Sequence, residues 1–67
     1  MNTITVNGNV EELEQTTSVL DLLAQNNLKP ELVAVEINEQ VVPKKTYATR
    51  TFENGDRVEI VHFVGGG

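Results

Sequence analysis

Apolar and polar positions alternate at the start of the chain, where Ile4 and Val6 stand between threonine and asparagine residues. An alternation of period two is typical of a strand with one buried face. The next two residues are Asn7-Gly8, a dipeptide that suits a two-residue hairpin because both positions tolerate positive φ. The chain therefore predicts a strand that turns back on itself at Asn7-Gly8.

The return strand is expected to run through Val10 and Leu13. These residues are three positions apart, so in a regular strand they lie on opposite faces of the sheet. Only a bulge between them would bring both side chains into the core.

The spacing of apolar residues becomes helical after Ser18. Ser18 is expected to be the N-cap of this helix. Its side-chain oxygen and the carboxylate of Asp21, three positions later, would satisfy free backbone N–H groups at the helix start. The next apolar residues form a stripe at helical spacing, made of Val19, Leu22 and Leu23 with Leu20 and Ala24 beside it. We expect a helix of about ten residues, which is marginal alone and must pack on a sheet. Asn26, Asn27 and Pro30 are expected to end it.

A second alternation of apolar residues, over residues 33–37, predicts a third strand. A turn at Asn38-Glu39 is expected to lead into a short apolar piece at Val41-Val42. Pro43 marks that piece as an edge strand or an exit from the sheet, because proline cannot donate to a strand ladder.

Residues 44–51 are expected to form an irregular connection that Tyr47 anchors to the core. Phe52, a turn at Asn54-Gly55-Asp56 and the pair Val58 and Ile60 then predict a last strand. The predicted order is strand, strand, helix, strand, short strand, strand. We expect one domain over residues 1–64, followed by a flexible glycine tail at residues 65–67 with low backbone order.

Composition narrows the function. A chain of 67 residues has little room for both a core and a large pocket, so its size argues against an autonomous enzyme. The net charge of −5 would repel nucleic acid and favours a basic partner surface. The first residues resemble no signal peptide, and no apolar run approaches a membrane span, so we expect a soluble, cytoplasmic protein.

The residue types argue against a metal site and against a catalytic nucleophile. One histidine, His62, and no cysteine cannot assemble a metal site, so we expect no metal and give His62 a structural or surface role. Ser18 has no histidine and acid arrangement with it, and no catalytic residue is predicted. Lys44-Lys45 is too short for a nucleic-acid patch and is expected to be a solvated loop.

The sequence ends in Gly65, Gly66 and Gly67. Residues without a Cβ can lie against another backbone without collision, which suits a thin probe that enters a partner's active site. The α-carboxylate is ionised at neutral pH, with an ordinary pKa of roughly 3.3–3.7, and is a poor electrophile until it is activated, for example as an acyl adenylate. This ending therefore favours a carboxylate that is activated, converted and transferred.

Two internal segments and the glycine ending resemble the ThiS-type sulfur carriers of thiamin biosynthesis, which belong to the ubiquitin-like β-grasp proteins. The segments are FENGDRVEI at residues 52–60 and VEINEQVVP at residues 35–43. The resemblance covers essentially the whole chain and implies an α+β, β-grasp fold with a mixed four- to five-stranded sheet packed on one helix. Gly66 and Gly67 match the family's final pair, whereas Gly65 is an additional glycine.

The resemblance also implies a reaction cycle. An E1-like, ThiF-type adenylating enzyme uses ATP and Mg to adenylate the Gly67 carboxylate, and a sulfur donor system then replaces AMP to give a thiocarboxylate. The carrier next docks on a ThiG-type thiazole synthase, to which it gives its sulfur. The chain itself would bind no cofactor and would be a co-substrate, with Gly66 and Gly65 recognised as its tail.

Three other functions stay open on the sequence. The same chemistry could serve molybdopterin or another sulfur-containing product, although the shortness of the chain favours the thiamin carriers over the molybdopterin-synthase small subunit. A ubiquitin-like modifier would join Gly67 to lysines of other proteins. A plain β-grasp binding module would not need its tail.

The last strand predicts a partner-binding surface. Val58 and Ile60 have the parity of core positions, which leaves Glu59, Val61 and Phe63 on the other face. One helix covers only one face of such a sheet, so these three residues are expected to form an exposed patch beside the tail. The alternative is that the sheet curls, or the loop around Tyr47 folds over, and buries Phe63.

Overall fold

Five strands form one mixed sheet in the computed structural model, which describes residues 1–63. In chain order the elements are β1 (Asn2–Val6), β2 (Asn9–Leu13), α1 (Val19–Gln25), β3 (Val33–Ile37), β4 (Gln40–Val41) and β5 (Arg57–His62), with short 3-10 turns at Pro30–Leu32 and Lys44–Thr46. The order within the sheet is β2-β1-β5-β3-β4. Only the contact between β1 and β5 is parallel.

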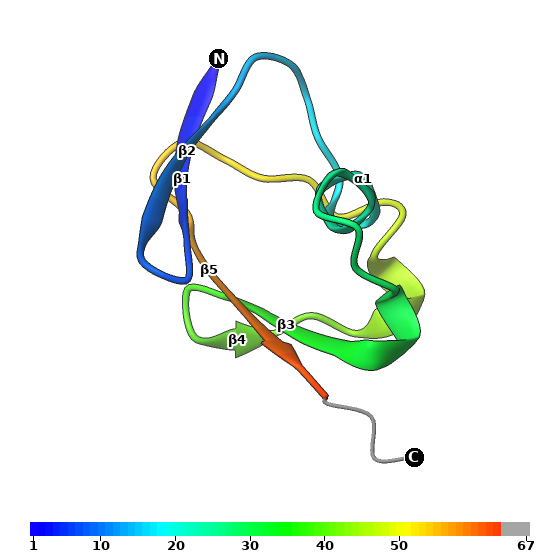
Figure 1. The fold of residues 1–67 in the computed structure, drawn as a ribbon. Helices are drawn as coiled ribbons and strands as arrows, with labels where there is room; N and C mark the ends of the chain where they lie inside the picture. The colour runs from blue at the N-terminus through cyan, green and yellow to red at the C-terminus, as the bar shows by residue number, and fades with distance from the viewer. Residues whose placement is uncertain (64–67) are drawn as a thin grey trace.

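The single helix of the described residues lies on one side of this sheet (Figure 1). A buried apolar cluster joins α1 to the sheet, and its members are Ile4, Val6, Leu13, Val19, Leu22, Leu23, Val33, Val35, Ile37, Val42, Tyr47, Phe52 and Val58. The expected mixed sheet packed on one helix is therefore confirmed. Among the residues described, no helix has the length and apolar character needed to cross a membrane.

Both predicted hairpin turns are confirmed by their backbone angles. Asn7 and Gly8 have φ values of 50° and 86°, and Asn38 and Glu39 have 53° and 71°. The two positive values in each turn fit the type I′ geometry that matches the twist of the flanking strands.

The return strand β2 contains no bulge, because its register with β1 is continuous from Asn2 opposite Leu13 to Val6 opposite Asn9. Val10 is accordingly 68% exposed, whereas Leu13 is buried. The two residues lie on opposite faces, as a regular strand requires.

The helix begins with the predicted cap. The Ser18 side chain accepts from the Asp21 N–H at 3.0 Å, and the Asp21 carboxylate accepts from the Ser18 N–H at 3.4 Å. The expected length of about ten residues is wrong, since α1 has 7 residues. Its end at Asn26 and Asn27 is as predicted: the Asn26 side chain donates to the Leu22 carbonyl, and Asn27 takes a left-handed φ of 58°.

The connection after β4 is anchored as expected, because Tyr47 is buried at 3% exposure. Burial raises the pKa of its hydroxyl above the ordinary value of 10.0, with a smaller opposing effect of a hydrogen bond with the Val35 backbone. Lys44 and Lys45 are exposed, as expected, but Lys44 also makes two contacts that the sequence did not indicate. Its ammonium donates to the Pro30 carbonyl at 2.9 Å and to the Val33 carbonyl at 2.7 Å, which ties this connection to the start of β3.

Replacing Glu39 by glycine should stabilise the fold. A left-handed backbone costs Glu39 about 1–2 kcal/mol, and glycine would remove this cost. Glycine also makes the unfolded chain more flexible, which offsets part of the gain. The free energy of unfolding should therefore rise by about 0.5–1 kcal/mol. Thermal or urea unfolding of Glu39→Gly measures the change. Gln40→Gly, one residue later and without positive φ, should instead lower stability, and equal effects of the two changes would contradict the interpretation.

Candidate functional site

The two faces of β5 differ as the sequence predicts. Val58 is 1% exposed and Ile60 is half-buried, and both pack toward the core. On the other face Glu59 is exposed, and Val61 and Phe63 expose 55% and 52% of their surface. The alternative in which Phe63 is buried is therefore wrong, and an exposed patch of Glu59, Val61 and Phe63 lies next to the predicted tail.

Neighbouring strands extend this patch across the sheet. The register places Ala34 of β3 opposite Val61, and Glu36 opposite Glu59. Two carboxylates directly opposite each other on adjacent strands repel, which is destabilising in the isolated protein. A cation brought by a partner would relieve that repulsion.

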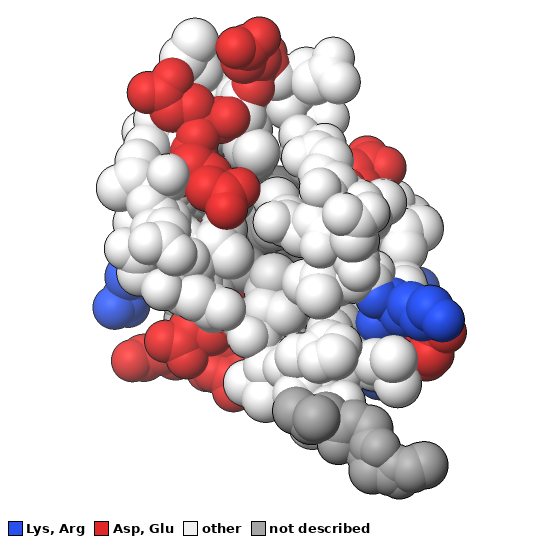
Figure 2. Space-filling view, viewed as in Figure 1, with Lys and Arg blue, Asp and Glu red and all other residues white. Residues whose placement is uncertain are grey.

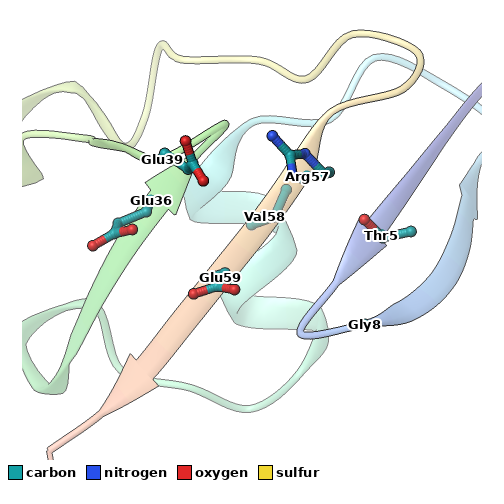
Figure 3. A pocket seen from close by; sticks show the side chains of 7 residues that line it. All are labelled: Thr5, Gly8, Glu36, Glu39, Arg57, Val58 and Glu59. Atoms are coloured by element: carbon teal, nitrogen blue, oxygen red, sulfur yellow. The ribbon is translucent and has the colours of Figure 1, made fainter.

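A shallow groove of about 360 Å³ lies on the same face (Figure 3). Its lining contains three glutamates and one arginine: Thr5, Gly8, Glu36, Glu39, Arg57, Val58 and Glu59. Elsewhere on the surface, acidic side chains also gather over the upper part of the β1 and β2 hairpin (Figure 2). The face beside β5 thus combines apolar side chains with an excess of negative charge.

Asn7 fixes the later half of β5. Its backbone N–H donates to the Val58 carbonyl at 2.9 Å, and its side chain bonds both backbone groups of Ile60. The Ile60 N–H donates to Asn7 Oδ1 at 2.8 Å, and Asn7 Nδ2 donates to the Ile60 carbonyl at 3.1 Å. Sequence reasoning missed this role, since it assigned Asn7 to the turn alone.

The start of β5 is held by a second polar cluster. Asp56 is buried at 7% exposure, and its carboxylate accepts from the Asn38 side chain at 2.9 Å and from the Glu53 N–H at 2.8 Å. Asn38 Oδ1 in turn accepts from the Arg57 N–H at 2.9 Å. Asn38, in the turn between β3 and β4, therefore fixes the start of β5, while Asn7 fixes the same strand at Ile60.

The residues predicted to carry the chemistry, Gly65, Gly66 and Gly67, lie outside the described residues. The described backbone remains bonded as far as Phe63, whose N–H donates to the Leu32 carbonyl at 2.8 Å. His62 is exposed, and residues 1–63 contain no group of three or more His, Cys, Asp or Glu side chains able to hold a metal ion.

Comparisons with known proteins match nearly the whole chain to the same family. A sequence model of the ThiS family matches residues 3–67. The chain is 40% identical over 63 residues to the Sulfur carrier protein ThiS of Bacillus subtilis, covering 92% of this chain and 96% of that protein. The crystal structure of a thiamine biosynthesis protein (ThiS) from Geobacter metallireducens is similar, with a TM-score of 0.79 and 32% identity, and the match covers 97% of this chain and 99% of that one.

A longer relative matches as well. The chain is 41% identical over 64 residues to a Thiazole synthase of Magnetococcus marinus, a match that covers 96% of this chain. The chain spans only 20% of the length of that relative.

Replacing Asn7 by glycine tests how β5 is held. Glycine keeps the positive φ and removes only the side-chain bonds to Ile60, so the free energy of unfolding should fall by about 1–3 kcal/mol. Chemical denaturation measures this loss, and amide exchange should become faster at Ile60. Asn27→Gly, at another asparagine of positive φ, is the control and should change stability little; an equal loss in both variants would contradict the interpretation.

Proposed function

The chain belongs to the ThiS family, and we propose that it is a sulfur carrier whose Gly67 carboxylate becomes a thiocarboxylate that supplies sulfur for thiazole formation in thiamin biosynthesis. The observation that carries the proposal is the end-to-end match to a Bacillus protein named as such a carrier. The position of β5 supports it, because side chains hold this strand at Arg57 and at Ile60, shortly before the terminal glycines in the sequence.

The chemistry follows from the carboxylate. Attack of a Gly67 oxygen on the α-phosphorus of ATP gives an acyl adenylate and pyrophosphate. Sulfur that the donor system delivers at the oxidation level of sulfide then attacks the acyl carbon, AMP leaves with the electron pair of the broken C–O bond, and loss of the S–H proton gives the thiocarboxylate. Because Gly67 has no side chain, the approach to its carbonyl is open, and because the chain has no cysteine, no internal thiol can intercept the activated group.

Both reactions belong to partner enzymes in this proposal. An E1-like, ThiF-type enzyme supplies the Mg-ATP site, and a ThiG-type thiazole synthase accepts the sulfur, while the carrier is a co-substrate without catalytic residues. Thiazole synthase is supported as a partner because relatives with that name contain a segment of about 64 residues similar to this chain.

We assign partner recognition to the patch of Glu59, Val61 and Phe63. Its two large apolar side chains are more than half exposed, which is the kind of surface that marks a protein interface. Glu59 and the opposing Glu36 add negative charge at its border, so a basic enzyme surface would gain from docking there. The patch lies directly before residues 64–67, so docking would bring Gly67 close to the partner's active site.

Intact mass tests the carrier chemistry. After incubation with an adenylating enzyme, Mg-ATP and a sulfur donor, the protein should gain the mass difference between one sulfur and one oxygen. A chain lacking Gly67 should gain nothing. No change with an enzyme of demonstrated activity would refute the proposal, and a ladder of heavier conjugates in cell extract would favour a protein modifier instead.

Val61→Asp tests the patch. Loss of an exposed apolar side chain and addition of a charge should weaken binding to the adenylating enzyme about tenfold or more. Because aspartate has a low strand propensity, the free energy of unfolding should fall by about 1 kcal/mol. Titration calorimetry and thermal unfolding measure the two effects. Val10→Asp is the matched control, since Val10 is also an exposed valine but lies on the edge strand β2. Unchanged binding and unchanged thiocarboxylate formation in Val61→Asp would show that the patch is not the interface.

A further inference from the structure

The β1 and β2 hairpin ends early, so the second half of β5 has β3 as its neighbour on one side and no strand of the described chain on the β1 side. β1 pairs with β5 only at Arg57 and Val58, and the chain then turns away at Asn7-Gly8. β5 itself continues to His62, well past the hairpin turn (Figure 3). Its final residues therefore form a free sheet edge on the β1 side.

The hydrogen-bond alternation identifies which backbone groups face that edge. Arg57 and Phe63 bond to the β3 side, through Asn38 and Leu32, whereas Val58 and Ile60 bond to the β1 side, through Asn7. Because a strand repeats every two residues, the N–H and carbonyl of His62 point to the β1 side as well. No strand among residues 1–63 continues the ladder at that position.

A groove of about 280 Å³ opens beside this edge, on the helix side of the sheet. Its floor includes the half-buried side chains of Leu28 and Ile60. Its border is polar. β2 contributes Asn9 and Glu11, the end of α1 contributes Asn26, and β5 contributes His62. The volume is at the lower limit for small-molecule sites and suits one long side chain.

We propose that this groove receives an extended segment of the thiazole synthase, which adds a short strand to β5 and places a lysine or arginine in the groove. The added backbone would bond to the N–H and carbonyl of His62, as the Asn7 amide does for Ile60. The aliphatic part of the cationic side chain would cover Leu28 and Ile60, and its charge would reach Glu11. The net charge of −5 favours such a cation over an acidic side chain.

This docking site is separate from the patch of Glu59, Val61 and Phe63. Asn9 and Glu11 share a face of β2 with the buried Leu13, whereas Val61 shares the opposite face with Ala34. The inference rests on the proposed function for the identity of the partner. Its new content is a second partner-binding region, on the helix side of the sheet and along the free edge of β5.

Glu11→Arg tests the cationic contact. Binding to the thiazole synthase should weaken about tenfold, because a favourable charge pair becomes a repulsive one. Glu12→Arg is the matched control, since it makes the same charge change one residue later on the opposite face of β2, and it should weaken binding no more than about twofold. Equal effects of the two variants would overturn the cationic contact, and thermal unfolding of both verifies that each remains folded.

Amide exchange of the wild-type chain tests the added strand without any substitution. In the complex, exchange of the His62 N–H should slow about tenfold or more, whereas the Ile60 N–H, already bonded to Asn7, should change less. An unaltered His62 rate in a saturated complex would overturn the proposal, and normal thiocarboxylate formation by intact mass would then leave the carrier function standing. If the wild-type chain neither gains sulfur nor binds the synthase, the proposed function fails, and this docking site fails with it.

Discussion

The paired hydrogen bonds between the Asn7 side chain and the Ile60 backbone determine how the end of the chain can be used. They satisfy the β1 side of β5 at the point where β1 departs, while β3 pairs with β5 along nearly its whole length on the other side. A longer β1 would have satisfied the same groups but would also have covered the edge at His62. The short hairpin and its asparagine together leave that edge accessible while β5 remains part of the sheet.

Local features of this fold could be predicted from sequence, because their causes lie within a few residues. The alternation of Ile4 and Val6, the Ser18 and Asp21 cap and the turn at Asn38-Glu39 each depend on neighbouring positions, and each is present. The exposure of Val61 and Phe63 was also predictable, because one helix covers one face of the sheet.

The contacts that position β5 could not be predicted in this way. Asn7 bonds to Ile60 across 53 positions, and Lys44 bonds to carbonyls before and within β3. Asparagine and lysine in loops usually face water, so their type alone does not distinguish a solvated side chain from a long-range tie. The helix length was overestimated because the caps at Ser18 and Asn26 lie outside the 7 helical residues, although α1 ends at the predicted asparagines.

A carrier that visits more than one enzyme must present its reactive end together with enough surface to be recognised. A domain of 67 residues has little surface to spare, because most of its apolar side chains are needed for the core. β5 resolves this constraint by contributing to the core through Val58, while the exposed residues of its outer face and the free edge at His62 directly precede the glycines in the sequence. The opposed carboxylates of Glu36 and Glu59 fit the proposed arrangement, since like charges directly opposite each other are destabilising and a basic partner would relieve their repulsion.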